Sequence, residues 1–196
     1  MQYPVTFTFK IVALAPQIYV RDSAGTLLMY VKQKLFKLKE AITIFADEGQ
    51  MRPIFAIKAD RVFDIGARYT ITDSQGMLVG AIKQQGLRSL WKAHYDIFYR
   101  DMPTPVMTIR EENPWVKVMD GLFGEIPLLG IFSGYFFHPA YLATRQDGTL
   151  VLRLEKRRAF LESTFTLEQR AAMHPDEEQL AMLSLLMMIL LERSRG

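Results

Sequence analysis

Alternation of apolar and polar residues opens the chain. In Val5–Val12 (VTFTFKIV) every second residue is apolar, and the residues between them are polar up to Lys10. A period of two places the two sets on opposite faces of a β-strand. The segment therefore predicts a strand with one face in a core and the other in solvent.

Pairs of β-rich runs joined by a short turn follow. In three of them an Asp precedes a Gly in the turn, and a fourth is looser. The Asp carboxylate accepts hydrogen bonds within its own turn and Gly takes positive φ without strain, so each pair predicts a hairpin. The hairpins are Ile18–Gln33, turning at Asp22–Gly25; Tyr69–Gln84, turning at Asp73–Gly76; Tyr141–Lys156, turning at Gln146–Gly148; and the looser Ala41–Lys58, turning around Asp47–Gly49.

Further strands are expected between and after these hairpins, near Leu90–Arg100, Val106–Glu111, Trp115–Met119 and Phe160–Phe165. About ten to twelve short strands in all predict a β-sandwich or a β-barrel. No linker rich in Pro, Gly or Ser divides the chain, so we expect one domain over residues 1–196.

The segment from about Asp176 to Arg195 predicts a helix with no polar face. Acidic residues begin it and arginines end it, as the helix dipole favours. Leu180–Leu191 (LAMLSLLMMILL) contains Ser184 as its one polar residue, and a helix apolar all round is buried. Its twelve residues cover about 18 Å, too short for a bilayer.

The number of strands and the apolar helix fit together in one fold. A barrel of about twelve strands has an interior wider than its own side chains can fill, and a helix without a polar face can occupy it. We therefore expect a mainly β (α+β) fold. It is a closed barrel of about twelve strands around the apolar C-terminal helix, at about residues 176–193.

Composition narrows the function classes. A formal charge of +3 is small for 196 residues and does not indicate nucleic-acid binding. The absence of cysteine excludes disulfides and thiolate metal sites. Because the start of the chain reads as a strand and not as a signal peptide, we expect a cytoplasmic protein. Gly121–Ala143 carries one charge, but four Gly and two Pro interrupt it, so we expect buried strands and loops there and no transmembrane segment.

The order of these elements resembles the LURP-one-related family of the tubby-like superfamily, which also includes the tubby C-terminal domain and the phospholipid scramblases. The resemblance implies a twelve-stranded barrel around a buried helix. Tubby domains bind phosphoinositide headgroups through basic surface residues, whereas the cysteines, acidic calcium-binding segment and spanning helix of scramblases have no counterpart here. The resemblance runs from about Ile18 to Leu191 and rests on Tyr19–Tyr30 with its basic continuation Val31–Glu40, Ala41–Lys58, Tyr69–Gln84 and the terminal helix.

Catalytic signatures are weak. The three histidines, His94, His138 and His174, lack zinc-ligand spacing. His94 and Asp96 share a strand face and could form an oriented base, although a plain cross-strand pair explains them as well. Ser133 lacks the spacing of a nucleophile elbow. We therefore expect no catalytic residue, no metal and no cofactor.

Basic residues after two of the hairpins are the candidate binding site. Lysines are also the usual protection of an exposed strand edge, which is the alternative explanation. We expect a non-enzymatic binding module for an anionic lipid headgroup or a protein partner, with an undetermined oligomeric state. The predicted anionic-ligand residues are Lys32, Lys34, Lys37, Lys39, Lys83, Arg88 and Lys92.

Two alternatives stay open. A pocket near Trp91, His94 and Trp115 would suit a small-molecule enzyme or carrier. The apolar stretch Leu122–Phe137 would suit a protein-interaction scaffold if it were exposed.

Overall fold

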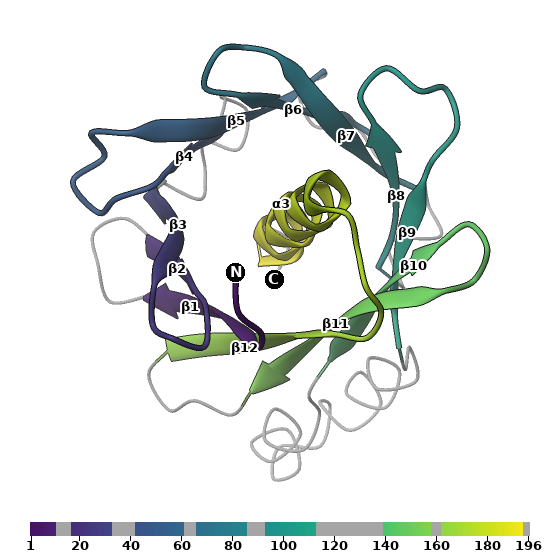
Figure 1. Ribbon diagram of the computed structural model, residues 1–196. Coiled ribbons are helices and arrows are strands. Elements are labelled where there is room, and N and C mark those ends of the chain that lie inside the picture. The colour runs from purple at the N-terminus through teal and green to yellow at the C-terminus, as the bar shows by residue number, and fades with distance from the viewer. Residues whose placement is uncertain are drawn as a thin grey trace, which may run out of the picture.

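A computed structural model describes residues 1–10, 17–32, 42–60, 66–85, 93–112, 139–157 and 162–193. These residues form twelve strands and a C-terminal helix, α3 (Figure 1). The strands are β1 (Val5–Lys10), β2 (Gln17–Arg21), β3 (Leu27–Lys32), β4 (Ile42–Phe45), β5 (Pro53–Ala59), β6 (Arg68–Asp73), β7 (Leu78–Gln84), β8 (His94–Tyr99), β9 (Met107–Glu111), β10 (Ala140–Arg145), β11 (Leu150–Arg157) and β12 (Glu162–Gln169). The predicted strand Trp115–Met119 lies outside the described residues.

The strands form a closed antiparallel barrel in which each strand pairs with its neighbours in sequence. Strand β12 closes the barrel by pairing with β1, from Val5 opposite Leu167 to Lys10 opposite Glu162. Closure leaves no sheet edge exposed, so the apolar side chains predicted from the alternation point into one enclosed space. The predicted closed barrel is confirmed.

The three Asp–Gly hairpins have the predicted turn chemistry. Gly25, Gly76 and Gly148 have φ angles of +81°, +80° and +87°. In the β6–β7 turn the carboxylate of Asp73 accepts hydrogen bonds from the backbone N–H groups of Gln75 and Met77, at 2.9 and 2.8 Å. The looser β4–β5 turn differs, because its positive φ falls on Gln50 (+59°), one residue after the glycine.

These turns all lie at one end of the barrel, which we call the turn rim. It comprises Met1–Pro4, the connections β2–β3, β4–β5, β6–β7, β8–β9 and β10–β11, the strand residues that adjoin them, and the β12–α3 connection with the first turn of α3. In Figure 1 these connections are the coloured loops. Antiparallel order places the other ends of the strands at the opposite rim.

Helix α3 (Pro175–Arg193) enters the barrel at the turn rim and runs through its interior (Figure 1). All twelve residues of Leu180–Leu191 are buried. Tyr95 on the inner wall, fully buried, donates a hydrogen bond to the Glu192 carboxylate (2.8 Å), which fixes the far end of the helix. The prediction that the helix is the barrel's core is confirmed.

The helix approaches the wall most closely at β7. A Cβ atom added to Gly80 would lie 2.7 Å from a methyl carbon of Leu180 and closer still to the carbonyl oxygen of Phe98. Gly80 has no side chain because the helix and β8 occupy that space.

Candidate functional site

Two of the predicted basic residues lie among the described residues. Lys32 ends β3 and Lys83 lies near the end of β7, and both point outward near the rim opposite the turns. Three strands separate β3 from β7, which at about 4.8 Å per strand is roughly 19 Å along the wall. Lys32 and Lys83 are therefore not neighbours. Lys34, Lys37, Lys39, Arg88 and Lys92 lie outside the described residues.

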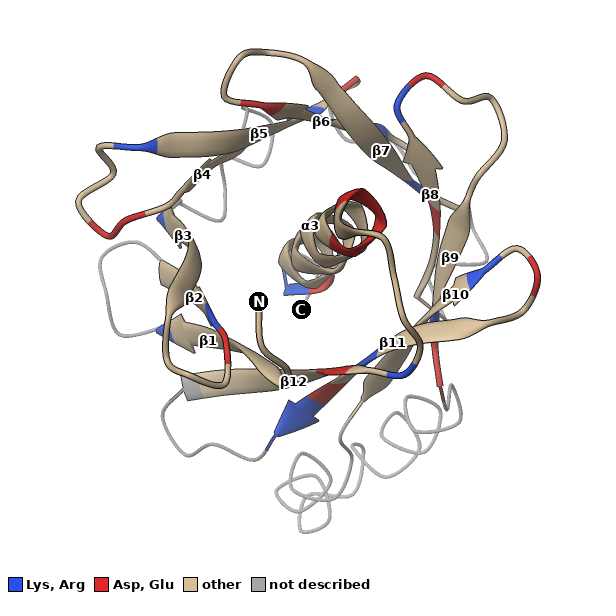
Figure 2. Cartoon of the chain, in the orientation of Figure 1, with Lys and Arg blue, Asp and Glu red and all other residues tan. Residues whose placement is uncertain are grey.

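Two basic residues that the sequence analysis missed lie on the wall between them. Arg68 on β6 is the direct register partner of Lys83. Lys58 on β5 pairs with Thr70, two residues further along β6. Lys58, Arg68 and Lys83 thus lie on the outer surfaces of three adjacent strands, and we call these three residues the basic face. Strands β5, β6 and β7 run side by side along the upper wall in Figures 1 and 2.

The cations of the basic face have no ion-pair partner within the described ranges of the chain. Arg68 reaches across β7, and its guanidinium lies 4.6 Å from the ring centroid of Phe98 on β8. Two carboxylates adjoin these strands and make hydrogen bonds with uncharged groups. Asp60 accepts the backbone N–H of Arg68 (2.9 Å), and Asp96, opposite Lys83, accepts a hydrogen bond from the Gln85 amide.

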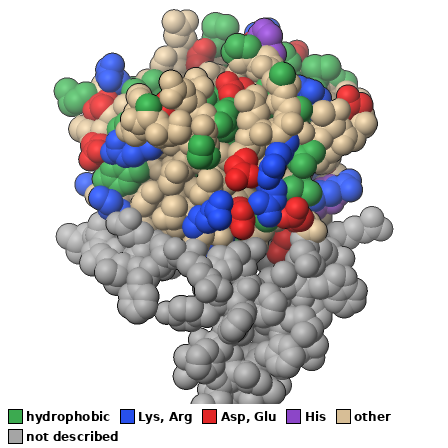
Figure 3. Space-filling model, turned by 60° about the horizontal axis from the view of Figure 1, so that its bottom comes forward, with side chains coloured by type: hydrophobic (Ala, Val, Ile, Leu, Met, Phe, Trp, Pro, Cys, Tyr) green, Lys and Arg blue, Asp and Glu red, His purple; other side chains and the backbone are tan. Residues whose placement is uncertain are grey.

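Arginines on the wall of β11 and β12 have a different environment. Arg153 contacts the carboxylates of Glu112 (2.8 Å) and Glu155 (2.9 Å), and Arg170 contacts Glu168 (2.5 Å). Figure 3 shows basic and acidic side chains side by side on this side of the molecule. Neighbouring carboxylates therefore neutralise the arginines of this wall. The unpaired positive charge of the basic face comes from its own strands, β5, β6 and β7.

The His94–Asp96 pair predicted from the strand pattern is present, with His94 Nε2 3.9 Å from Asp96 Oδ1. Both residues are on the outer face of β8, where the sequence alternation places them. Trp91 and Trp115, the other two members of the predicted pocket, lie outside the described residues, so that pocket stays a prediction. The apolar stretch Leu122–Phe137 also lies outside them.

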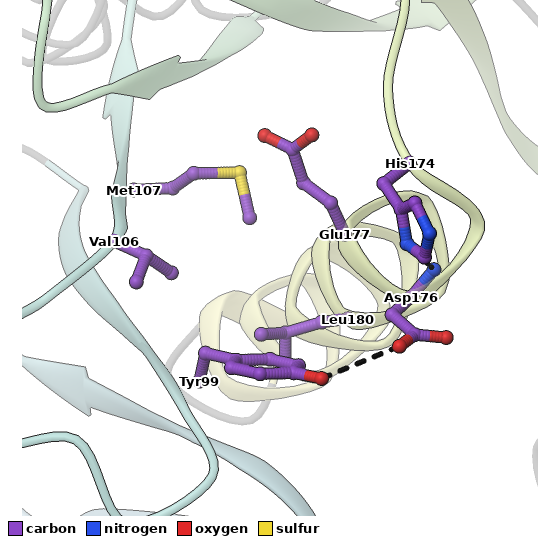
Figure 4. A pocket seen from close by; sticks show the side chains of 7 residues that line it. All are labelled: Tyr99, Val106, Met107, His174, Asp176, Glu177 and Leu180. Carbon is purple, nitrogen blue, oxygen red and sulfur yellow. Dashed lines mark hydrogen bonds between the residues drawn. The ribbon is translucent and has the colours of Figure 1, made fainter.

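A pocket of about 360 Å³ opens instead at the turn rim, between the start of α3 and the end of β8 (Figure 4). Its apolar lining comes mainly from Val106, Met107 and Leu180. The Tyr99 hydroxyl, 3.3 Å from the Asp176 carboxylate, joins the wall to the helix. No sequence pattern indicates this pocket, because its lining comes from segments separated by about seventy residues and shares no motif.

Glu177 lies at the same pocket and is held by Arg145. The guanidinium donates to both carboxylate oxygens, at 2.6 and 2.7 Å, and also to the carbonyl oxygen of Ala172 at 2.7 Å. This bidentate hydrogen bonding lowers the pKa of Glu177 below its ordinary value. The pocket is lined by two carboxylates, those of Asp176 and Glu177. Among the described residues an arginine pairs with Glu177, and none pairs with Asp176.

The sequence carries a signal for the direction of Lys58 but not for the pairing of Arg68. Equal spacing from the turn at Asp73–Gly76 would not place Arg68 opposite Lys83, and the observed register includes a shift between Ile71 and Thr72. Lys58 follows the inward Ile57 in a strand and must point outward. Alternation identifies the outward direction of such residues, but the pairing of Arg68 with Lys83 depends on a register shift that no local pattern predicts.

No helix among the described residues is long and apolar enough to cross a membrane. A search of curated proteins gives no match. Among solved structures, the X-ray structure of a protein from Arabidopsis thaliana is similar, with a TM-score of 0.48 and 14% identity, over 96% of this chain and 91% of that one. The sequence model of the LURP-one-related family matches residues 27–189, which include ten of the twelve strands and most of α3. The chain therefore belongs to the LURP-one-related family.

Proposed function

We propose that the protein is a non-enzymatic binding module for an anionic lipid headgroup, which it binds at the basic face. The observation that supports this most directly is that Lys58, Arg68 and Lys83 come together from three strands without an ion-pair partner among the described residues. Like charges on adjacent strands repel, and a phosphate group would relieve that repulsion.

The chemistry of the three side chains suits a headgroup phosphate. The guanidinium of Arg68 makes a cation–π contact with the ring of Phe98, which limits its freedom on the wall. Lys58 and Lys83 are exposed and add mobile point charges on either side. Each cation near an anionic membrane surface contributes about 1 kcal/mol, so three give a weak and reversible attachment.

Arg88 and Lys92 follow Lys83 in sequence and stay predicted contributors to the basic face. Lys34, Lys37 and Lys39 follow Lys32, which is not a neighbour of Lys83, and stay a separate predicted group. Anionic lipids give the cytoplasmic leaflet its negative surface potential, so this function fits a protein of the cytoplasm.

Liposome flotation tests the proposal. The wild type should float with vesicles containing phosphatidylserine and a phosphoinositide, and should not float with phosphatidylcholine alone. Changing Lys58, Arg68 and Lys83 together to Gln should abolish flotation, and excess inorganic phosphate should leave wild-type flotation in place if a lipid surface is the ligand.

The matched control changes Arg153 and Arg157 of β11 and Arg170, which follows β12 at the turn rim, to Gln; this removes the same charge from arginines that are paired. That variant should float like the wild type. Equal loss in both variants would mean that net charge alone drives binding, and undiminished binding of the first variant would remove the basic face from consideration. Competition by free phosphate would point to a soluble anion.

A further inference from the structure

Exposed methionines gather at the turn rim. Among the described residues the exposed large apolar side chains are Met1, Met51, Met77 and Met102, with exposed fractions of 46%, 82%, 60% and 42%. Met51, Met77 and Met102 belong to three successive turns, and Met1 belongs to the N-terminal segment that meets the β2–β3 turn through the Ser23 N–H and the Gln2 carbonyl (3.1 Å). The outer barrel walls carry no comparable side chain within the described ranges.

The backbone under these methionines is fixed while the side chains are free. The Met51 N–H donates to the Asp47 carboxylate (3.1 Å), as the Met77 N–H does to Asp73 (2.8 Å). The Met102 N–H donates to the Tyr99 carbonyl oxygen (3.1 Å). An unbranched thioether side chain on a rigid support adapts its shape to an apolar partner, and methionine is common at surfaces that bind in this way.

The pocket at the turn rim adds an apolar recess beside the exposed methionine side chains. Val106 and Met107 line it directly after the turn that bears Met102, and Leu180 of α3 lies opposite (Figure 4). Asp176 lies beside this apolar lining. A ligand that fills the recess therefore meets apolar side chains and, beside them, a negative charge.

Charge selects the kind of partner. Among the side chains of the turn rim, nine carboxylates outnumber five guanidinium groups by four, and the acidic residues of its turns are coloured red in Figure 2. A membrane with anionic lipids would be repelled, whereas a cationic apolar segment would be attracted. The acidic residues are Asp22, Asp47, Glu48, Asp73, Asp101, Asp147, Asp176, Glu177 and Glu178, and the basic ones are Arg21, Arg52, Arg100, Arg145 and Arg170.

We infer that the turn rim is a docking surface for a basic amphipathic segment of a protein partner. The apolar face of the segment covers Met51, Met77 and Met102 and enters the pocket, and its cations meet the surrounding carboxylates. This surface lies at the opposite end of the barrel from the basic face, so one chain can join a protein at one rim and an anionic lipid at the other.

Fluorescence anisotropy with the full chain tests the inference. The probe is a labelled synthetic helix of leucine and lysine, about 18 residues long, with all leucines on one face. It should bind, while a scrambled helix of the same composition and a leucine–glutamate helix should not. Changing Met51, Met77 and Met102 to Gln should weaken binding roughly tenfold or more.

Two controls keep the result interpretable. The methionine variant should keep the wild-type melting temperature, because its three side chains are exposed. The Gln variant of Lys58, Arg68 and Lys83 should bind the peptide like the wild type. Lipid binding at the basic face and peptide binding at the turn rim can therefore be refuted independently of each other. Absence of peptide binding, equal binding of the scrambled helix, or indifference to the methionine changes would overturn the inference. Loss of vesicle flotation in the methionine variant would also overturn it, in favour of a membrane surface.

Discussion

Replacing Ser184 with Ala should stabilise the protein. Ser184 is fully buried in the middle of α3, and its hydroxyl has no hydrogen-bond partner among the described residues. An unsatisfied buried hydroxyl costs about 1–3 kcal/mol. Alanine removes that cost and gains a few tenths of a kcal/mol in helix propensity. The void left by one oxygen atom costs a few tenths, at about 24 cal/mol per Å³.

The expected net gain in the free energy of unfolding is therefore about 1–3 kcal/mol, which for a chain of this length raises the melting temperature by about 2–4 °C per kcal/mol. Urea denaturation with an unchanged m-value measures it. Ala181 provides a matched control, because it is also fully buried in α3, and Ala181→Ser should lose a similar amount. A less stable Ser184→Ala variant would refute the reasoning, since it would mean that the hydroxyl has a partner in solution.

Three further changes test the fold. Gly80→Ala should lower the unfolding free energy by about 1–3 kcal/mol or more, since its Cβ collides with β8 and α3; an unchanged urea midpoint would mean the helix does not press on β7. Leu186→Asp should abolish cooperative unfolding by circular dichroism because it buries a charge, whereas Met51→Asp at an exposed turn should fold normally; a folded Leu186→Asp would contradict the central position of the helix. Arg145→Gln should destabilise at pH 7, and because the pKa of Glu177 is lowered in the folded state, the difference from wild type should shrink as pH falls through that pKa; a difference constant with pH would exclude the ion pair as its source.

Local chemistry accounts for what the sequence predicted well. The side chain of the Asp in an Asp–Gly turn accepts hydrogen bonds from backbone N–H groups of the same turn. Each hairpin can therefore be recognised in the sequence without knowledge of the rest of the fold. Helix α3 can be recognised in the same way, because a helix without a polar face must be buried wherever it lies in the fold. Its predicted span, from about Asp176, differs by one residue from the observed start at Pro175.

Arrangement around the barrel was harder to predict. Lys32 and Lys83 end similar hairpins, and that similarity favoured one joint patch. Their separation depends on how many strands lie between them in space, which is known only once the closure order is known. The turn-rim pocket depends in addition on where α3 enters the barrel, and no local pattern specifies that position.

The order of elements along the chain has a consequence for synthesis. The inner wall consists of apolar side chains from strands made early, and the helix that covers them is translated after the last strand. A ribosome-bound chain that lacks α3 would present a ring of strands with nothing to enclose. Completion of the core must therefore follow the emergence of α3 from the ribosome, and until then the apolar faces of the nascent strands stay exposed and prone to aggregation.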